Sequence, residues 1–185
     1  MKRQGFTLFA LAALAVSLAA LPAFAALKAG ATAPDFTAKA SLAGKDFTFS
    51  LKQALAKGPV VLYFYPAAYT GGCDIEAHTF ATDAAKFAAA GATIIGVSAD
   101  SIQRLDSFSS DPNYCAGKFP VASDPDGKIA ATYGLTLIPP QKGVTDVRGK
   151  AVTHGFIPRT TFVIASDGKV VATLSSSADH LAPDQ

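Results

Sequence analysis

The chain has 185 residues, of which 50% are hydrophobic and 16% are charged, and its formal net charge at pH 7 is +2. This length predicts one domain, and it is sufficient to bury an ordinary hydrophobic core without metals or several disulfides. The small net charge and the apolar composition exclude a disordered chain and a strongly basic nucleic-acid-binding protein.

The first 25 residues have the three parts of a secretory signal peptide. Residues 2–3 are basic, residues 6–21 form an apolar run, and residues 23–25 read AFA, which is a small-residue cleavage site. An uncleaved membrane anchor is the alternative, but the apolar run is shorter than the roughly 20 residues that a span needs. We therefore expect export to the periplasm or beyond the cell, with cleavage before Ala26 and no membrane attachment afterwards.

The mature chain, residues 26–185, alternates between strands and helices. Period-two alternation or a continuous β-branched and aromatic run marks the strands, and apolar residues at steps of three and four mark the long helix. The predicted elements are an extended arm at 27–39, strands at 46–51 and 60–65, a helix at 71–90, a strand at 92–97, a helix at 101–108, a short strand at 119–122, helical turns at 128–133, and a hairpin of strands at 160–165 and 169–174. This order predicts a single α/β domain with a thioredoxin-like fold, in which helices flank a central mixed β-sheet.

Cys73 lies where a thiol becomes reactive. It follows a buried strand and falls in the first turn of the predicted helix, with Thr70 as the expected N-cap. Unsatisfied N–H groups and the positive dipole end at a helix start favour the thiolate, which is the nucleophilic form. Burial on the apolar helix face would raise the thiol pKa unless a cation lies nearby, and Arg159 is our candidate for that cation. The alternative is an inert cysteine that packs as a small hydrophobe.

A four-residue pattern carries a family resemblance. Pro66, Thr70 and Cys73 form P-x-x-x-T-x-x-C, and Arg159 follows in the segment PRTTF at 158–162. In this order the residues resemble the peroxiredoxins, the alkyl hydroperoxide reductase and thiol-specific antioxidant family, and most of all their bacterioferritin comigratory branch. The resemblance covers residues 28–175.

The resemblance implies a peroxidase that reduces hydrogen peroxide and organic hydroperoxides. The Cys73 thiolate attacks the O–O bond and becomes a sulfenic acid, while Thr70 and the Cys73 N–H hold the peroxide oxygens. Arg159 stabilises the thiolate and the charge on the breaking bond. Pro66 shields the site from water, and Glu76 matches a Glu or Gln that often supports it. The family needs no metal or organic cofactor, and a thioredoxin-like or other thiol is the implied reductant of a monomer or weak homodimer.

Cys115 is the candidate for resolving the sulfenic acid through a disulfide with Cys73. It lies in a loop-like stretch, and some relatives resolve from that region. Relatives with a nearby second cysteine carry it five residues after the first, where this chain has His78, which we interpret as an exposed helix residue. An outside thiol is the alternative to Cys115.

Two other functions compete with the peroxidase. An exported thioredoxin-like thiol–disulfide oxidoreductase would need a C-x-x-C motif, which the sequence lacks. A non-catalytic binding domain would use its two cysteines for one structural disulfide. The three histidines are dispersed, so no zinc site is expected.

The sequence after residue 175 is short. Relatives usually continue into a final helix, whereas residues 176–185 are all that follow here. We expect either that such a helix is dispensable or that the chain is a truncated version.

Overall fold

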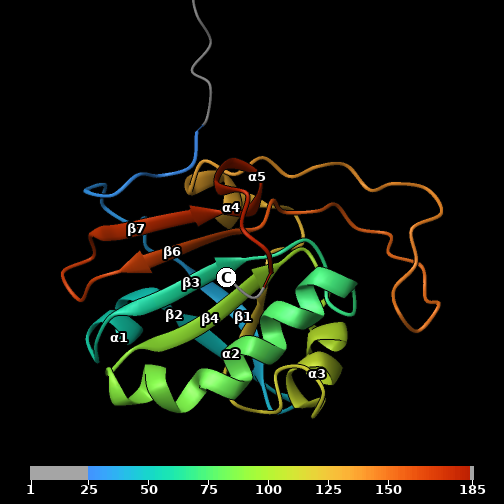
Figure 1. Cartoon of the computed structure of the whole chain (residues 1–185), viewed down its shortest axis with the longest axis horizontal. Coiled ribbons are helices and arrows are strands. Elements are labelled where there is room, and N and C mark those ends of the chain that lie inside the picture. The colour runs from blue at the N-terminus through green and yellow to red at the C-terminus, as the bar shows by residue number, and fades with distance from the viewer. Residues whose placement is uncertain (1–24, 184–185) are drawn as a thin grey trace, which may run out of the picture.

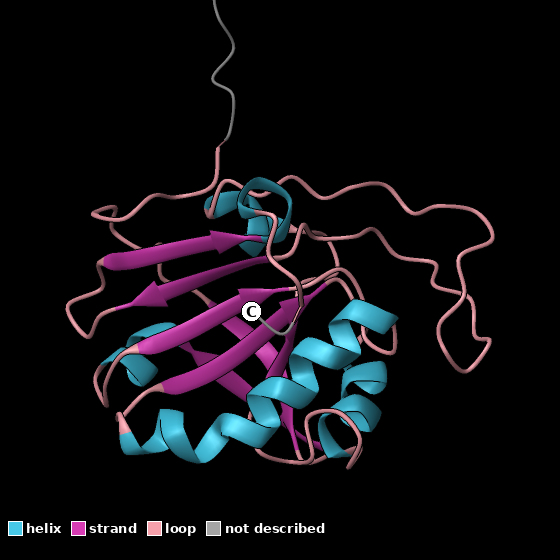
Figure 2. Cartoon of the chain, in the orientation of Figure 1, coloured by secondary structure: helices cyan, strands magenta, loops and turns pink. Residues whose placement is uncertain are grey.

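The computed structural model describes residues 25–183 (Figure 1). The predicted signal peptide lies outside the described residues except for Ala25, so its cleavage stays a prediction. The helices and strands, drawn by type in Figure 2, are β1 (Thr37–Leu42), β2 (Lys45–Ser50), α1 (Leu51–Leu55), β3 (Val60–Phe64), α2 (Gly71–Ala89), β4 (Thr93–Ser98), α3 (Ile102–Ser110), β5 (Val121–Ser123), α4 (Lys128–Thr132), β6 (Thr160–Ile164), β7 (Val170–Ser175) and α5 (Ser176–Asp179). None of the described helices has the length and apolar character needed to cross a membrane.

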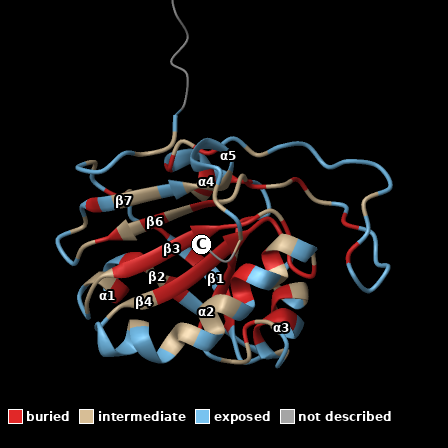
Figure 3. Ribbon diagram, in the orientation of Figure 1, coloured by how far each residue is buried: buried red, intermediate tan, exposed pale blue. Residues whose placement is uncertain are grey.

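The strands form one mixed sheet in the order β2-β1-β5-β4-β3-β6-β7. The pairs β3–β4 and β4–β5 are parallel, and the other neighbours are antiparallel. β3 and β4 are buried almost throughout, as their continuous apolar runs predicted (Figure 3). The predicted α/β domain with a central mixed sheet is therefore confirmed.

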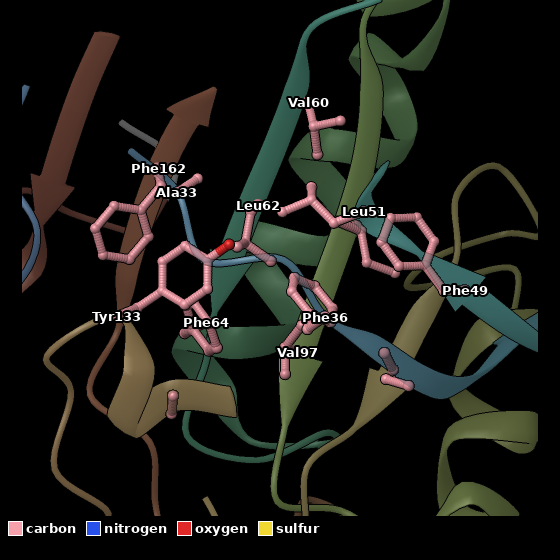
Figure 4. Close-up of a cluster of buried hydrophobic side chains, with 14 of the residues drawn as sticks. Ala33, Phe36, Phe49, Leu51, Val60, Leu62, Phe64, Val97, Tyr133 and Phe162 are labelled. Atoms are coloured by element: carbon pink, nitrogen blue, oxygen red, sulfur yellow. The ribbon is translucent and has the colours of Figure 1, made fainter. Parts of the chain in front are cut away.

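Each face of the sheet carries its own apolar core. Leu62 and Phe64 pack on the face covered by α1 and α4, together with aromatic rings such as Tyr133 (Figure 4). Val61 and Tyr63 alternate with them and pack on the other face, beneath α2 and α3. This division follows from the period of two in a strand. Both cysteines belong to the second core.

Some elements differ from those predicted. The arm expected at 27–39 is irregular up to Phe36 and then continues as β1, whose small alanines give a weak strand signal. Leu51 begins α1 instead of ending a strand, because the Ser50 hydroxyl accepts the N–H of Gln53 and caps that helix. After β7 the described chain forms only the four-residue helix α5.

Residues 135–159 join α4 to β6 without a named helix or strand. Two isolated bridges, Ile138↔Phe156 and Thr145↔Ala151, fold this segment back on itself. In Figure 1 it forms the orange excursion on the side of the molecule where β3 ends and α2 begins. The segment therefore lies close to the end of the sheet that carries Cys73.

Candidate active site

The site forms where β3 passes into α2. Thr70 has extended dihedrals and is the N-cap of α2, as predicted, and its carbonyl accepts the N–H of Cys73 at 2.8 Å. Its hydroxyl does not cap the helix. It donates instead to the carbonyl of Ala67 at 2.7 Å, because the preceding loop turns that carbonyl towards it. Pro66 is half-buried in the same loop, directly after the end of the β3 run.

Arg159 reaches the thiol across the sheet. It immediately precedes β6, whose first residue, Thr160, pairs with Phe64 at the end of β3. That pairing brings Arg159 beside α2, where its Nη2 donates to the Cys73 Sγ at 3.1 Å. Its Nη1 pairs with the Glu76 carboxylate one turn further along α2. The guanidinium thus bridges the thiol and the carboxylate.

Burial and the cation act on the thiol in opposite directions. Burial raises the pKa of Cys73, whereas the charge of Arg159, the backbone at Ala67 and the Thr70 hydroxyl lower it. The result is a pKa above the ordinary value, so the lowering expected from the helix start is outweighed in this closed, 2%-exposed state. The thiolate therefore depends on Arg159 for its stabilisation.

Glu76 titrates close to neutral pH. Burial raises its pKa to about 7, although the charge and hydrogen bond of Arg159 lower it. The carboxylate and the thiolate consequently compete for one guanidinium. Protonation of Glu76 leaves more of the positive charge of Arg159 uncompensated beside Cys73.

A cavity of about 290 Å³ adjoins this bridge. Arg159 and Glu76 form part of its wall, and the rest is mostly apolar, including Val61, Phe80 and Leu174. Residues 181–183 of the C-terminal tail close one side of the cavity. Arg159 and Glu76 therefore border a mostly apolar cavity.

Cys115 is fully buried in the loop after α3 and is not bonded to Cys73. Burial raises its pKa strongly, and the charges of Asp111 and Asp74 add to the effect. In this state Cys115 is a protonated thiol. His78 is exposed, as expected, and its Nδ1 lies 3.2 Å from the carbonyl oxygen of Asn113, so it links α2 to the Cys115 loop.

Comparison with known proteins shows the family of the chain that carries this site. Residues 29–173 match the model of the AhpC/TSA family. The chain belongs to that family. A protein of Mycobacterium tuberculosis named as a peroxiredoxin is 37% identical over 126 residues, which are 68% of this chain and 73% of that protein. The peroxiredoxin Bcp of Xanthomonas campestris is 33% identical over 112 residues, or 60% of this chain and 63% of that one.

A solved structure agrees with the sequence relatives. The crystal structure of peroxidoxin BcpB from Mycobacterium tuberculosis superposes with a TM-score of 0.67 at 32% identity, covering 85% of this chain and 90% of that one. The thioredoxin-like fold and the bacterioferritin comigratory branch are therefore confirmed. The chain is a peroxiredoxin, a thiol-dependent peroxidase that acts on a peroxide substrate with a thiol reductant.

The peroxiredoxin holds its active-site loop with residues that sequence patterns did not single out. The Asp100 carboxylate accepts the N–H of Ala68 at 2.8 Å, and Arg104 donates to the carbonyl of Ala68 at 2.7 Å. Val147, from the 135–159 segment, donates its N–H to the carbonyl of Tyr69 at 2.9 Å. In the sequence, an Asp two residues after a buried strand is only a weak signal that its carboxylate holds a loop. Within residues 25–183, no group of three His, Cys, Asp or Glu side chains is arranged to hold a metal.

Proposed function

We propose that this peroxiredoxin reduces hydrogen peroxide and organic hydroperoxides through Cys73. The observation that carries the proposal is the bridge of Arg159 between the Cys73 sulfur and Glu76. A fixed guanidinium beside a buried thiol stabilises the thiolate before the reaction and the charge on the departing oxygen during it. In this structure the Thr70 hydroxyl donates to the Ala67 carbonyl and the Cys73 N–H donates to the Thr70 carbonyl, and we propose that both turn to the peroxide oxygens when the substrate binds. Pro66 is proposed to restrict water.

The proposed first step is a two-electron transfer. The Cys73 thiolate attacks one peroxide oxygen, the S–O bond forms and the O–O bond breaks. The second oxygen leaves as an alkoxide or hydroxide and takes a proton, giving an alcohol or water. Sulfur is oxidised to the sulfenic acid, and the peroxide is reduced.

The proposed second step forms a disulfide between Cys73 and Cys115. The Cys115 sulfur displaces the sulfenic oxygen, which leaves as water. A disulfide requires Cα atoms within about 7 Å and suitable Cβ directions. Because Cys73 is held in the first turn of α2, we propose that the helix unwinds locally at Gly71 and Gly72. Two equivalents of a thioredoxin-like or other thiol then return both cysteines to the reduced state.

The cavity beside Arg159 supports organic hydroperoxides as substrates. Its apolar wall matches an alkyl substituent, and it is connected to Cys73 through Arg159, which lies in its wall and donates to the sulfur, whereas Cys73 itself does not line it. Hydrogen peroxide needs only the polar end. We therefore propose both substrate classes for this one site.

Stopped-flow oxidation of the reduced mature protein tests the proposal. Cys73→Ser is expected to lose peroxide consumption, and a wild-type rate in that variant would overturn the assignment. Cys115→Ser is expected to react once and then stall as a sulfenic acid, which mass spectrometry detects. Peptide mapping of the oxidised wild type distinguishes an internal Cys73–Cys115 bridge from a cross-linked dimer, and a free Cys115 would assign resolution to an outside thiol.

We also propose that the protein works outside the cytoplasm as a monomer or weak homodimer. The basic start, the apolar run and the AFA site at 23–25 support export. Fractionation of the producing cell tests this, with recovery in the periplasm expected. Sedimentation of the mature protein over a range of concentrations tests the oligomeric state.

A further inference from the structure

A chain of charged side chains connects the active-site loop to the 135–159 segment. Asp100 lies at one end, fully buried after β4, with Oδ1 2.7 Å from Nε of Arg104 on α3. Arg104 continues to Asp146, whose Oδ2 lies 2.9 Å from its Nη1. Asp146 in turn binds the side chain of Arg148 at 2.7 Å.

Tyr69 is the residue that this chain of charges surrounds. Its backbone has φ of +60°, a conformation that non-glycine residues rarely adopt. The guanidinium carbon of Arg148 lies 3.2 Å from the centre of its ring, and that of Arg104 lies 5.4 Å away. With the Val147 N–H on its carbonyl, Tyr69 is held through both backbone and ring. Strain at such a position persists only where the surroundings impose it.

Asp146 is built to keep its charge. Burial raises its pKa, but hydrogen bonds from the Arg148 side chain and from the N–H groups of Lys150 and Arg148 lower it, and the pKa is about 2. The Asp146 side chain has no exposed surface. Burying a carboxylate between two guanidiniums costs desolvation free energy, and separating the charges once they are paired costs more. The pairing therefore fixes the positions of Arg104 and Arg148 relative to each other.

His154 makes a second connection to Asp100. Its Nε2 lies 2.8 Å from Oδ1 of Asp100, and its Nδ1 lies 2.7 Å from the carbonyl oxygen of Gly155. Both neighbours are hydrogen-bond acceptors, so both ring nitrogens must carry protons to satisfy them. Burial and the charge of Arg104 lower the pKa of His154, but Asp100 and the Gly155 carbonyl raise it above the ordinary value.

Tyr69 also contacts the side of the molecule that carries Cys115. Its ring lies 5.0 Å from the ring of Phe108 and 5.2 Å from that of Tyr114, measured between centroids. Tyr114 directly precedes Cys115, which belongs to the same apolar core. Opening of the loop at Tyr69 therefore disturbs the packing around both cysteines.

We infer that Asp146, Arg148 and His154 are positioning residues, which hold the loop before Cys73 closed and so set how readily Cys73 leaves its helix to meet Cys115. The inference deepens the proposed function and rests on it for the two chemical steps. As long as the form with this loop open is rare, weakening these contacts leaves the population of the closed form nearly unchanged. Peroxide attack then keeps its rate, whereas disulfide formation accelerates in proportion to the open population.

Arg148→Met and Asp146→Asn test this in the full mature chain. Loss of the stacked cation is expected to increase the open population about tenfold. The rate of disulfide formation after one equivalent of peroxide should rise by that factor, while the rate of peroxide consumption stays within about twofold. Lys142→Met removes an exposed charge from the same segment and should change neither rate.

A second control separates local opening from general instability. Val170→Ala removes buried methyl groups from the core on the opposite face of the sheet. It should lower the free energy of unfolding without accelerating disulfide formation. If Arg148→Met accelerates that step no more than Val170→Ala does, the positioning role is wrong.

Hydrogen exchange in the reduced protein tests the inference without peroxide and without any reaction of Cys73. Amides of residues 67–73 are expected to exchange about tenfold faster in Arg148→Met than in the wild type. Equal exchange would overturn the inference even if Cys73 proves to be the peroxide-reacting residue. Conversely, faster exchange in Arg148→Met together with peroxide consumption by Cys73→Ser would refute the proposed function. It would still support the role of Arg148 in keeping the loop closed.

The pH dependence isolates His154. As pH rises through its pKa, the ring loses a proton and one of its two bonds, so loop exchange should rise beyond the ordinary pH dependence of amide exchange. His154→Gln retains one neutral donor towards Asp100 and should lack this additional rise. Asp100 and Arg104 face the ring and are present in both proteins, so the difference between the two profiles reports His154. Identical profiles would exclude His154 from the role.

Discussion

Arg159 is shared by two acids, and we expect this sharing to set the reactivity of Cys73. Its guanidinium donates to the Cys73 sulfur and pairs with the Glu76 carboxylate. Burial disfavours both anions, as the raised pKa values of Cys73 and Glu76 show. One cation thus has to offset the desolvation of two groups.

Removal of that cation should slow peroxide consumption. In Arg159→Met the thiol loses the group that lowers its pKa, so the pH–rate profile should shift to higher pH, and the maximal rate should fall about a hundredfold. Stopped-flow measurement from pH 5 to 9 checks both effects. Lys86→Met, which removes an exposed cation near the end of α2, is the matched control. An unchanged profile would mean that another group supplies the charge.

Removal of the competing anion should have the opposite effect on the thiol. Glu76→Gln retains an oxygen that accepts from Arg159 but loses the negative charge. The pKa of Cys73 should fall, and the pH–rate profile should shift to lower pH. The same stopped-flow series measures this shift, and a shift to higher pH would show that Glu76 acts mainly by orienting Arg159.

Glu76 also makes the stability of the protein depend on pH. Its pKa is about 7 in the folded chain, above the ordinary value of 4.5. Between these values the unfolded state releases the proton first, so the free energy of unfolding should fall as pH rises from about 4.5 to 7, by up to about 3 kcal/mol. Urea unfolding of the wild type and of Glu76→Gln checks this, because the variant lacks this part of the decline. Parallel curves for the two proteins would contradict it.

The first turn of α2 has two glycines with different surroundings. A Cβ on Gly71 would meet nothing within 4 Å, whereas one on Gly72 would lie 3.2 Å from Nη2 of Arg159 and 3.1 Å from Pro183. Both glycines weaken the helix start relative to alanine. The element therefore combines ease of unwinding at one position with close packing of the cation at the next.

These surroundings predict different outcomes for two similar substitutions. Gly71→Ala should favour the folded helix start and slow disulfide formation several-fold, with little effect on peroxide consumption. Gly72→Ala should slow peroxide consumption as well, because its Cβ crowds the guanidinium that contacts Cys73. Single-turnover kinetics of both variants measure the two steps. Equal effects on peroxide consumption would show that the contact with Arg159 does not matter.

At the scale of the whole molecule, the start of the expected mature chain is attached to the domain. Leu27 donates its N–H to the carbonyl of Tyr133, and its own carbonyl accepts from the hydroxyl of Thr173. Cleavage before Ala26 would keep both bonds. Cleavage at the predicted site would therefore cost the domain neither hydrogen bond of Leu27.

N-terminal sequencing of the exported protein should therefore give Ala26 as the first residue. A variant that begins at residue 30 would lose both bonds of Leu27 and should be less stable by roughly 1–3 kcal/mol. Thermal unfolding of the two forms compares them. Recovery of residues 1–25 in the membrane fraction would contradict cleavage.

The sequence by itself determined the elements whose signals are local. The apolar runs of β3 and β4, the helical spacing of α2 and the turn of the final hairpin predicted the mixed sheet. A strand buried on both faces leaves a continuous apolar run, and a helix buried along one stripe leaves a periodic pattern. The resemblance brought Pro66, Thr70, Cys73 and Arg159 together as candidate site residues. α1 and β1 were not predicted, because a five-residue helix and an alanine-rich strand show little hydrophobic periodicity.

Only the tertiary structure decided the balance of forces at the site. The helix start suggested a lowered pKa for Cys73, but burial beneath the sheet raises it, and burial is a property of packing across several elements. The sharing of Arg159 with Glu76 follows from the pairing of β6 with β3. The bonds of Asp100 to Ala68 and of Val147 to Tyr69 join residues far apart in sequence. Such contacts leave no pattern in a single chain, because each depends on where distant elements pack.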